Sequence, residues 1–189
     1  GDIVAIAGMK TATVADTLAD KDVTEAIEAQ PIDPPTITVT FGINTSPLAG
    51  RDGTKVQSRV IRDRLVKEAE SNVAIKVNDT DTGDAFEVHG RGELQMGVLI
   101  ENMRREGFEL SISRPQVLFR TIDGVRNEPI EEVTVDVDDE YSGTVIEKLT
   151  LRKGELVEMR PGGVGKTRIV AHVPSRGLIG YHGEFLTDT

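Results

Sequence analysis

The stretch Glu93-Leu-Gln-Met-Gly-Val-Leu-Ile-Glu-Asn-Met-Arg-Arg-Glu-Gly-Phe-Glu-Leu-Ser-Ile112 combines two hydrophobic periods. Up to about Glu106 its apolar residues keep helical spacing, which predicts a helix. Gly107 is a typical residue to end a helix, and apolar residues at every second position after it predict a strand. The helix and strand need further strands upstream to form a sheet.

The preceding residues supply them. Alternation predicts a strand over Thr36–Ile43, and Thr54 with Gln57 forms a capping box that opens a helix to about residue 71. Two short strands follow, over residues 73–78 and 85–89. The predicted order is β-α-β-β-α-β, which is the ferredoxin-like, split βαβ arrangement.

A second unit of the same kind follows. A strand over residues 130–137 and a helix over 141–153 precede a hairpin around residues 161–165, and a final helix is predicted over 176–186. The fourth strand of this unit is lacking. The predicted fold class is therefore α+β, with two ferredoxin-like units of which the second lacks its last strand.

The N-terminal residues predict no unit of their own. Residues 1–8 predict a lone strand, which is unstable without partners, and the acidic, proline-containing residues up to 35 are typical of a linker. We expect a chain cut from a larger protein, with a barrel remnant and linker at 1–35. The expected units are residues 36–113 and 114–189.

Composition excludes several classes of protein. Aromatic residues make up only 4% of the 189 residues and Trp is absent, which argues against an aromatic platform for stacking bases. Absence of Cys excludes disulfides and thiol catalysis and fits a cytoplasmic protein. No apolar run is long enough to span a membrane.

The net charge of −10 argues at first against a nucleic-acid partner, because phosphate binding needs Lys and Arg. The acidic residues are concentrated, however. Residues 1–35 carry a net charge of −5 and residues 128–140 carry −7, so the other 141 residues carry a net +2. Local basic clusters can therefore still meet phosphates.

One basic cluster comprises Arg51, Lys55, Arg59 and Arg62, of which the last three fall on one stripe of the predicted first helix. The alternative is an ordinary solvated helix face.

Two Arg-Gly pairs, Arg91-Gly92 and Arg176-Gly177, stand at the predicted starts of helices, where a cation is unfavourable unless an anion is nearby. Glycine lets a backbone approach a partner closely, so RNA phosphate is the candidate ligand. Alternatively, the glycine serves the turn and the arginine points to water.

No enzymatic motif is present. The segment Gly162–Thr167 resembles a phosphate-binding P-loop, but Arg160 occupies the place of its first glycine and a strand pattern follows where a helix is needed. A hairpin turn is the better interpretation. The three histidines lack metal-binding spacing, so we expect no metal, no cofactor and no catalytic residue in this chain.

Three groups of motifs carry a family resemblance. Gly90-Arg-Gly-Glu-Leu94, Met103-Arg-Arg-Glu-Gly-Phe-Glu-Leu110 and Ser113-Arg-Pro115 resemble the third domain of translational GTPases. Val173-Pro-Ser-Arg-Gly-Leu-Ile-Gly180 resembles their fifth domain, and residues 1–8 resemble the last strand of their second-domain β-barrel. The details favour the BipA (TypA) family, with Gln95 as a departure where many members have His.

The resemblance implies a parent protein that hydrolyses GTP with Mg²⁺ in a domain absent here. It implies a cytoplasmic ribosome-binding factor that works at the elongation-factor site in stress response and large-subunit assembly. The expected partners are ribosomal RNA and proteins, besides the missing GTPase and C-terminal domains. We expect RNA and ribosome contacts from Arg51, Lys55, Arg59, Arg62, Arg91 and Arg176.

Two alternatives stay open. The two units could act as a structural relay that orients the missing domains, without touching RNA. An enzyme in its own right has only the glycine-rich turn at residues 162–167 as support.

Overall fold

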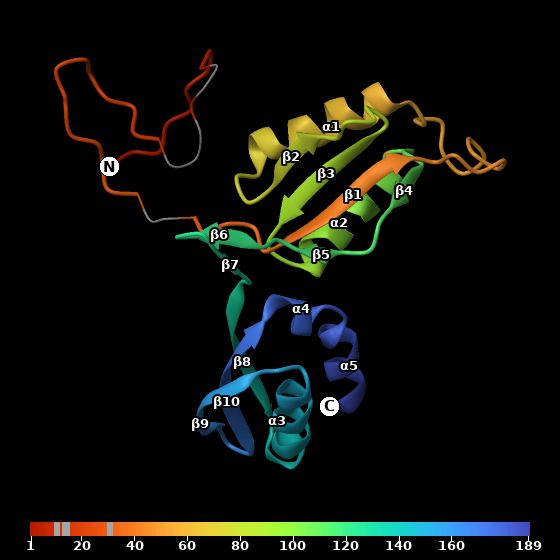
Figure 1. Cartoon of the computed structure of the whole chain (residues 1–189). Coiled ribbons are helices and arrows are strands. Elements are labelled where there is room, and N and C mark those ends of the chain that lie inside the picture. The colour runs from red at the N-terminus through yellow and green to blue at the C-terminus, as the bar shows by residue number, and fades with distance from the viewer. Residues whose placement is uncertain (10–11, 13–15, 30–31) are drawn as a thin grey trace.

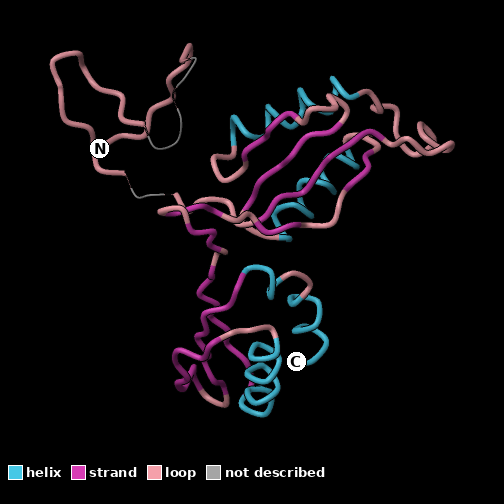
Figure 2. The backbone as a smooth tube through the Cα atoms, in the orientation of Figure 1, coloured by secondary structure: helices cyan, strands magenta, loops and turns pink. Residues whose placement is uncertain are grey.

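The computed structural model describes residues 1–9, 12, 16–29 and 32–189. Helices and antiparallel sheets alternate along the chain, so the predicted mixture of α and β structure is confirmed. Two α/β units follow an N-terminal segment whose described residues form no helix or strand, as Figure 1 and Figure 2 show.

The first unit has the element order β1-α1-β2-β3-α2-β4. Its strands run in the order β2-β3-β1-β4, all neighbours being antiparallel. The short strand β5 (Gln116–Val117) pairs with the start of β1. The other elements are β1 (Ile37–Ile43), α1 (Ser58–Ser71), β2 (Lys76–Asp79), β3 (Ala85–Gly90), α2 (Glu93–Arg105) and β4 (Leu110–Ile112).

Both helices of this unit cover the same face of its sheet. Alternate residues of β1 and β3 are buried, and the register places Phe41 opposite Phe86 and Val39 opposite Val88. These side chains share one core with Ile61 and Leu65 of α1 and with buried residues of α2. The opposite face carries the polar residues of the alternation.

The second unit contains a three-stranded sheet in the order β8-β10-β9, with antiparallel neighbours. Val145 and Leu149 of α3 and Tyr181 of α5 pack on one sheet face and form a separate core. Among the described residues, β8 pairs along one edge only. The elements are β8 (Ile130–Asp138), the 3₁₀ turn Asp139–Tyr141, α3 (Ser142–Leu151), β9 (Glu155–Gly163), β10 (Lys166–Pro174), α4 (Ser175–Leu178) and α5 (Tyr181–Asp188).

The glycine-rich segment forms the predicted hairpin. It joins β9 to β10, and the residues after Lys166 continue as a strand rather than as a helix. A P-loop is therefore ruled out, because no helix follows the turn and its backbone amides cannot surround a phosphate at a helix N-terminus.

The expected strand at residues 1–8 is wrong. The structure assigns no strand to residues 1–9, whose apolar side chains such as Ile3 and Val4 are exposed. A strand needs a hydrogen-bonded neighbour, and the described part of the chain offers this segment none. Residues 10–11, 13–15 and 30–31 of the expected linker lie outside the described residues.

The expected start of the first helix is also wrong. Helix α1 begins at Ser58, and no side chain caps it. Lys55 is extended instead, because its N–H donates to Gly107 O (3.1 Å) and its carbonyl accepts from Glu109 N (3.3 Å). The predicted capping box of Thr54 and Gln57 does not form, because the bridge holds the chain extended at Lys55.

Two further differences concern turns. Gly180 has a φ of +75° and separates α4 from α5 within the predicted last helix. A hairpin that we did not predict, β6 (Arg120–Ile122) and β7 (Val125–Asn127), turns through Asp123-Gly124. Both turn residues have positive φ, which is the usual chemistry of a two-residue hairpin loop.

Separate cores predict separate unfolding of the two units. Leu65→Ala removes a fully buried side chain from the first core, and we expect a loss of about 2–5 kcal/mol in that unit's stability. Both tyrosines, Tyr141 and Tyr181, lie in the second unit. In urea, the unfolding transition measured by tyrosine fluorescence should therefore stay unchanged. Circular dichroism should detect an additional transition at lower urea, from the first unit. An equal shift of both signals would contradict independent cores.

Candidate nucleic-acid interface

The six predicted contact residues fall into two groups. The side chains of three already bind other residues of the chain, and the other three form no close ion pair with the described residues. Arg62 lies on α1 and forms a two-pronged pair with Asp79 at the end of β2, at 2.6 and 2.8 Å. This pair raises the pKa of Arg62 and lowers the pKa of Asp79, in both cases chiefly through the side-chain hydrogen bond. The charge of Arg62 is thus balanced within the chain.

Arg91 is held by the segment that enters the first unit. Its Nε and Nη2 atoms both donate to the carbonyl oxygen of Asp33 at 3.1 Å, and the Asp33 carboxylate lies 3.7 Å away. Thr36 Oγ1 donates to the Arg91 carbonyl at 3.0 Å. The next residue, Gly92, is an extended N-cap with open space around its Cα. Arg91 therefore fixes the entering segment against the start of α2.

Arg176 is part of a denser cluster. Its Nε donates to Glu128 at 2.7 Å, which raises the pKa of Arg176, while the buried Ser175 donates to Glu131 at 2.5 Å. A Cβ on Gly177 would overlap the carbonyl oxygen of Arg152. The close backbone approach that this glycine permits is thus made to the chain's own α3 end, and we correct the expectation that it serves a ligand.

The other three predicted residues keep their charge available. The side chain of Arg51 makes no hydrogen bond or ion pair with any described residue. Arg59 is 91% exposed, and its nearest carboxylate, Asp63, lies 4.0 Å away. Lys55 lies over the Phe108 ring with Nζ 4.6 Å from the centroid, in the bridge before α1. Lys55 is therefore not part of the predicted helical stripe, because it lies before α1 begins.

Sequence reasoning missed several exposed cations. None of them forms an ion pair with the described residues, and none belongs to the basic clusters that the sequence singled out. These cations are Lys67, Lys76, Arg114, Arg120 and Lys153.

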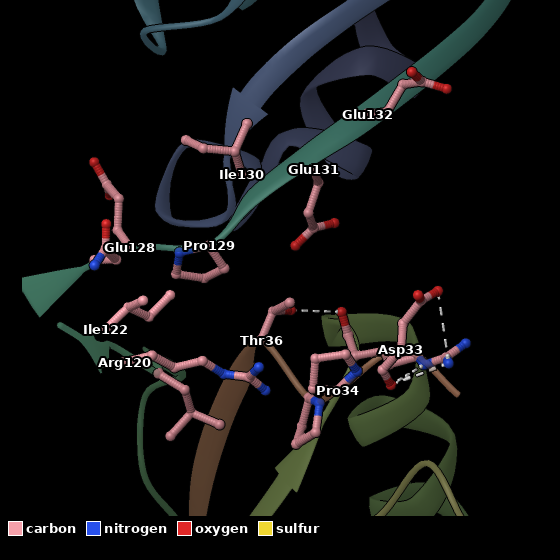
Figure 3. A pocket seen from close by; sticks show the side chains of 14 residues that line it. Asp33, Pro34, Thr36, Arg120, Ile122, Glu128, Pro129, Ile130, Glu131 and Glu132 are labelled. Carbon is pink, nitrogen blue, oxygen red and sulfur yellow. Dashed lines mark hydrogen bonds and ion pairs between the residues drawn. The ribbon is translucent and has the colours of Figure 1, made fainter. Parts of the chain in front are cut away.

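A hollow of roughly 590 Å³ lies between the entering segment, the β6–β7 hairpin and the start of β8 (Figure 3). Pro34, Ile122 and Ile130 give it apolar walls. Four carboxylates and two arginines line it, the acids being Asp33, Glu128, Glu131 and Glu132. A phosphate is disfavoured there, because the acids outnumber the cations.

Metal and membrane features are not found in the described residues. No group of three or more His, Asp or Glu side chains there is arranged to hold a metal ion. The helices described are all too short or too polar to cross a bilayer.

Comparison with known proteins shows what the chain is similar to. Residues 125–189, which include the sheet β8-β10-β9 and helices α3 to α5, match the protein family described as Elongation factor G C-terminus. The whole chain is similar to proteins named large ribosomal subunit assembly factor BipA. It is 51% identical to the one from Haemophilus influenzae, 52% to the one from Escherichia coli K12 and 47% to the one from Bacillus subtilis 168. The resemblance to BipA is thus confirmed along the full chain, which spans 31% of the length of each of these relatives.

The close packing around Gly177 predicts that a methyl group added there destabilises the second unit. Gly177→Ala should lower the stability of the second unit by about 1–3 kcal/mol, because the new Cβ meets a fixed carbonyl rather than a flexible side chain. Gly143→Ala in α3 is the matched control, since nothing lies within 4 Å of its added Cβ. It should leave stability unchanged or raise it by about 1 kcal/mol. Urea unfolding followed by tyrosine fluorescence measures both, and equal stabilities would refute the close packing.

Proposed function

We propose that this chain is the ribosome-contacting part of a translational GTPase of the BipA type, acting in assembly of the large ribosomal subunit. The observation that carries the proposal is identity of about half of all residues, over the whole chain, to relatives named for that role. The elongation factor G match of the second unit supports it.

The proposed contact is made by cations to RNA phosphates, and it follows the shape of the RNA rather than its sequence. Arg51, Lys55 and Arg59 are the first candidates, because no carboxylate holds them within 3.5 Å. Arg62 and Arg176 belong to the interface only if a phosphate replaces their carboxylate partners, and Arg91 only if it releases Asp33. Exposed pairs contribute little to stability, so such an exchange is energetically accessible.

The finer features of the family belong to the same proposal. We propose that GTP hydrolysis and its Mg²⁺ belong to a domain outside these residues, so that the chain itself performs no catalysis. Both units are proposed to be ferredoxin-like, with boundaries at residues 36–113 and 114–189 after the segment 1–35. A cytoplasmic location, a role in stress response and contact with ribosomal proteins near the elongation-factor site are further parts of this proposal.

A second function, as a structural relay between other domains, is favoured by one contact. The backbone N–H of Gly180, which precedes α5, donates to the Glu93 carboxylate of α2 at 2.7 Å, across the two units. Such a contact couples the orientation of one unit to the other without any RNA.

The test is binding of the chain to purified large ribosomal subunits by cosedimentation at several salt concentrations. We expect Arg51→Gln with Arg59→Gln to weaken binding about tenfold and to reduce the dependence of affinity on salt, because two phosphate contacts are lost. Arg104→Gln with Arg105→Gln is the control with the same change in net charge. Those two arginines are also exposed, but both pair with Glu101.

Equal losses in the two double variants would reduce the effect to net charge and contradict a local interface. Failure of the chain to bind, while the longer protein binds, would support the relay function instead.

A further inference from the structure

A carboxylate that the sequence did not single out organises the longest connection of the first unit. Oε2 of Glu109 accepts hydrogen bonds from the backbone N–H groups of Gly50 (2.9 Å), Asp52 (3.3 Å) and Gly53 (3.2 Å). Oε1 accepts a short hydrogen bond from the side-chain amide of Asn44. Four donors from residues 44–53 thus converge on one carboxylate.

The connection between β1 and α1 needs such an anchor. Its residues 44–57 form neither helix nor strand, apart from the single bridge at Lys55, so their backbone N–H groups need acceptors elsewhere. Loops of this length without regular structure are uncommon and usually functional. We call residues 44–53 the β1–α1 loop.

The base of the β1–α1 loop is packed as well as hydrogen-bonded. A Cβ on Gly53 would lie 2.7 Å from the Gly107 carbonyl oxygen, so glycine is required where the loop crosses the end of α2. Gly50 has a φ of +85°, which turns the chain back toward Glu109. Desolvation raises the pKa of Glu109, but the hydrogen bonds from Asn44 and the loop amides outweigh it and lower the pKa overall. The carboxylate is therefore held in its charged form.

The outer part of the β1–α1 loop is free to meet a partner. The loop extends beyond the end of the sheet near β4, as the orange segment of Figure 1 shows. Leu48 is 56% exposed there, and Arg51 is exposed and stands between two of the anchored amides. A loop fixed before binding loses less conformational entropy on binding than a free loop does.

We propose that Glu109 is a positioning residue, whose carboxylate presets the β1–α1 loop so that Arg51 is held ready for a phosphate of ribosomal RNA. This inference rests on the proposed function, because it names how one contact residue is presented. Glu109 itself does not touch the RNA: its charge is directed to the loop amides.

The experiment combines hydrogen exchange with a double-mutant cycle in the whole chain. Glu109→Gln keeps the size of the side chain and removes the charge. We expect exchange of the Gly50, Asp52 and Gly53 amides to accelerate about tenfold, with core amides unchanged. Cosedimentation with large ribosomal subunits should show equal weakening by Glu109→Gln and Arg51→Gln, and no further loss in the double variant.

Glu106→Gln is the matched control. Glu106 also stands at the end of α2 and pairs with Arg64 at 2.7 Å, but it has no contact with the loop amides. This variant should leave both loop exchange and ribosome affinity unchanged. If Glu109→Gln fails to fold, Asn44→Ala removes one donor only and should give the same changes at smaller size.

The outcomes separate the two proposals. Unchanged loop exchange in the Glu109→Gln or Asn44→Ala chain would overturn the positioning role. Additive losses in the double variant would also overturn it, because Glu109 would then act on binding independently of Arg51. Faster loop exchange with normal binding by Arg51→Gln would leave the loop anchored by Glu109 but remove Arg51 from the RNA interface.

Discussion

Pairing of arginine with carboxylates inside the chain decides which surfaces can meet a phosphate. Arg62 with Asp79, Arg168 with Asp136 and Arg176 with Glu128 each join residues that lie far apart in the sequence. Each pair is at least partly exposed and adds little stability, but it balances the charge of a guanidinium that could otherwise bind a phosphate. We therefore propose that RNA binding depends on the cations outside these pairs, above all Arg51 and Arg59.

The same interaction changes the meaning of the net charge. The acidic residues of β8 contribute to the chain's total of −10, yet Asp136 and Asp138 face Arg168 and Lys166 across the sheet. The charge of these two aspartates is therefore balanced by cations of the second unit itself. Overall charge alone therefore says little about a partner, because it does not show where the charges are balanced within the fold.

Periodicity predicted most of the fold because burial in each unit is one-sided. Alternation located β1, β3, β8 and β10, and helical spacing located α2. It failed where a distant contact outweighed a local signal. The bridge of Lys55 to Phe108 overrode a capping box, and the strand pattern of residues 1–8 found no neighbour. Such contacts join residues about 50 positions apart, which no local pattern records.

The site was less accessible to sequence reasoning. Motifs pointed to Arg176-Gly177, but the glycine packs against Arg152 and the arginine pairs with Glu128. Glu109, by contrast, gave no signal, because its role depends on amides from a loop more than 50 residues earlier. The sequence could indicate which residues were candidates, but the partners of their side chains became known only from the fold.

The most direct measurement is photo-crosslinking of the ribosome-bound chain, with a photoreactive amino acid at position 48 in the β1–α1 loop. The comparison position is 164, at the fully exposed tip of the β9–β10 hairpin. If the β1–α1 loop meets RNA as proposed, position 48 forms a crosslink to ribosomal RNA. Crosslinks to RNA from position 164 alone, with none from position 48, would contradict it.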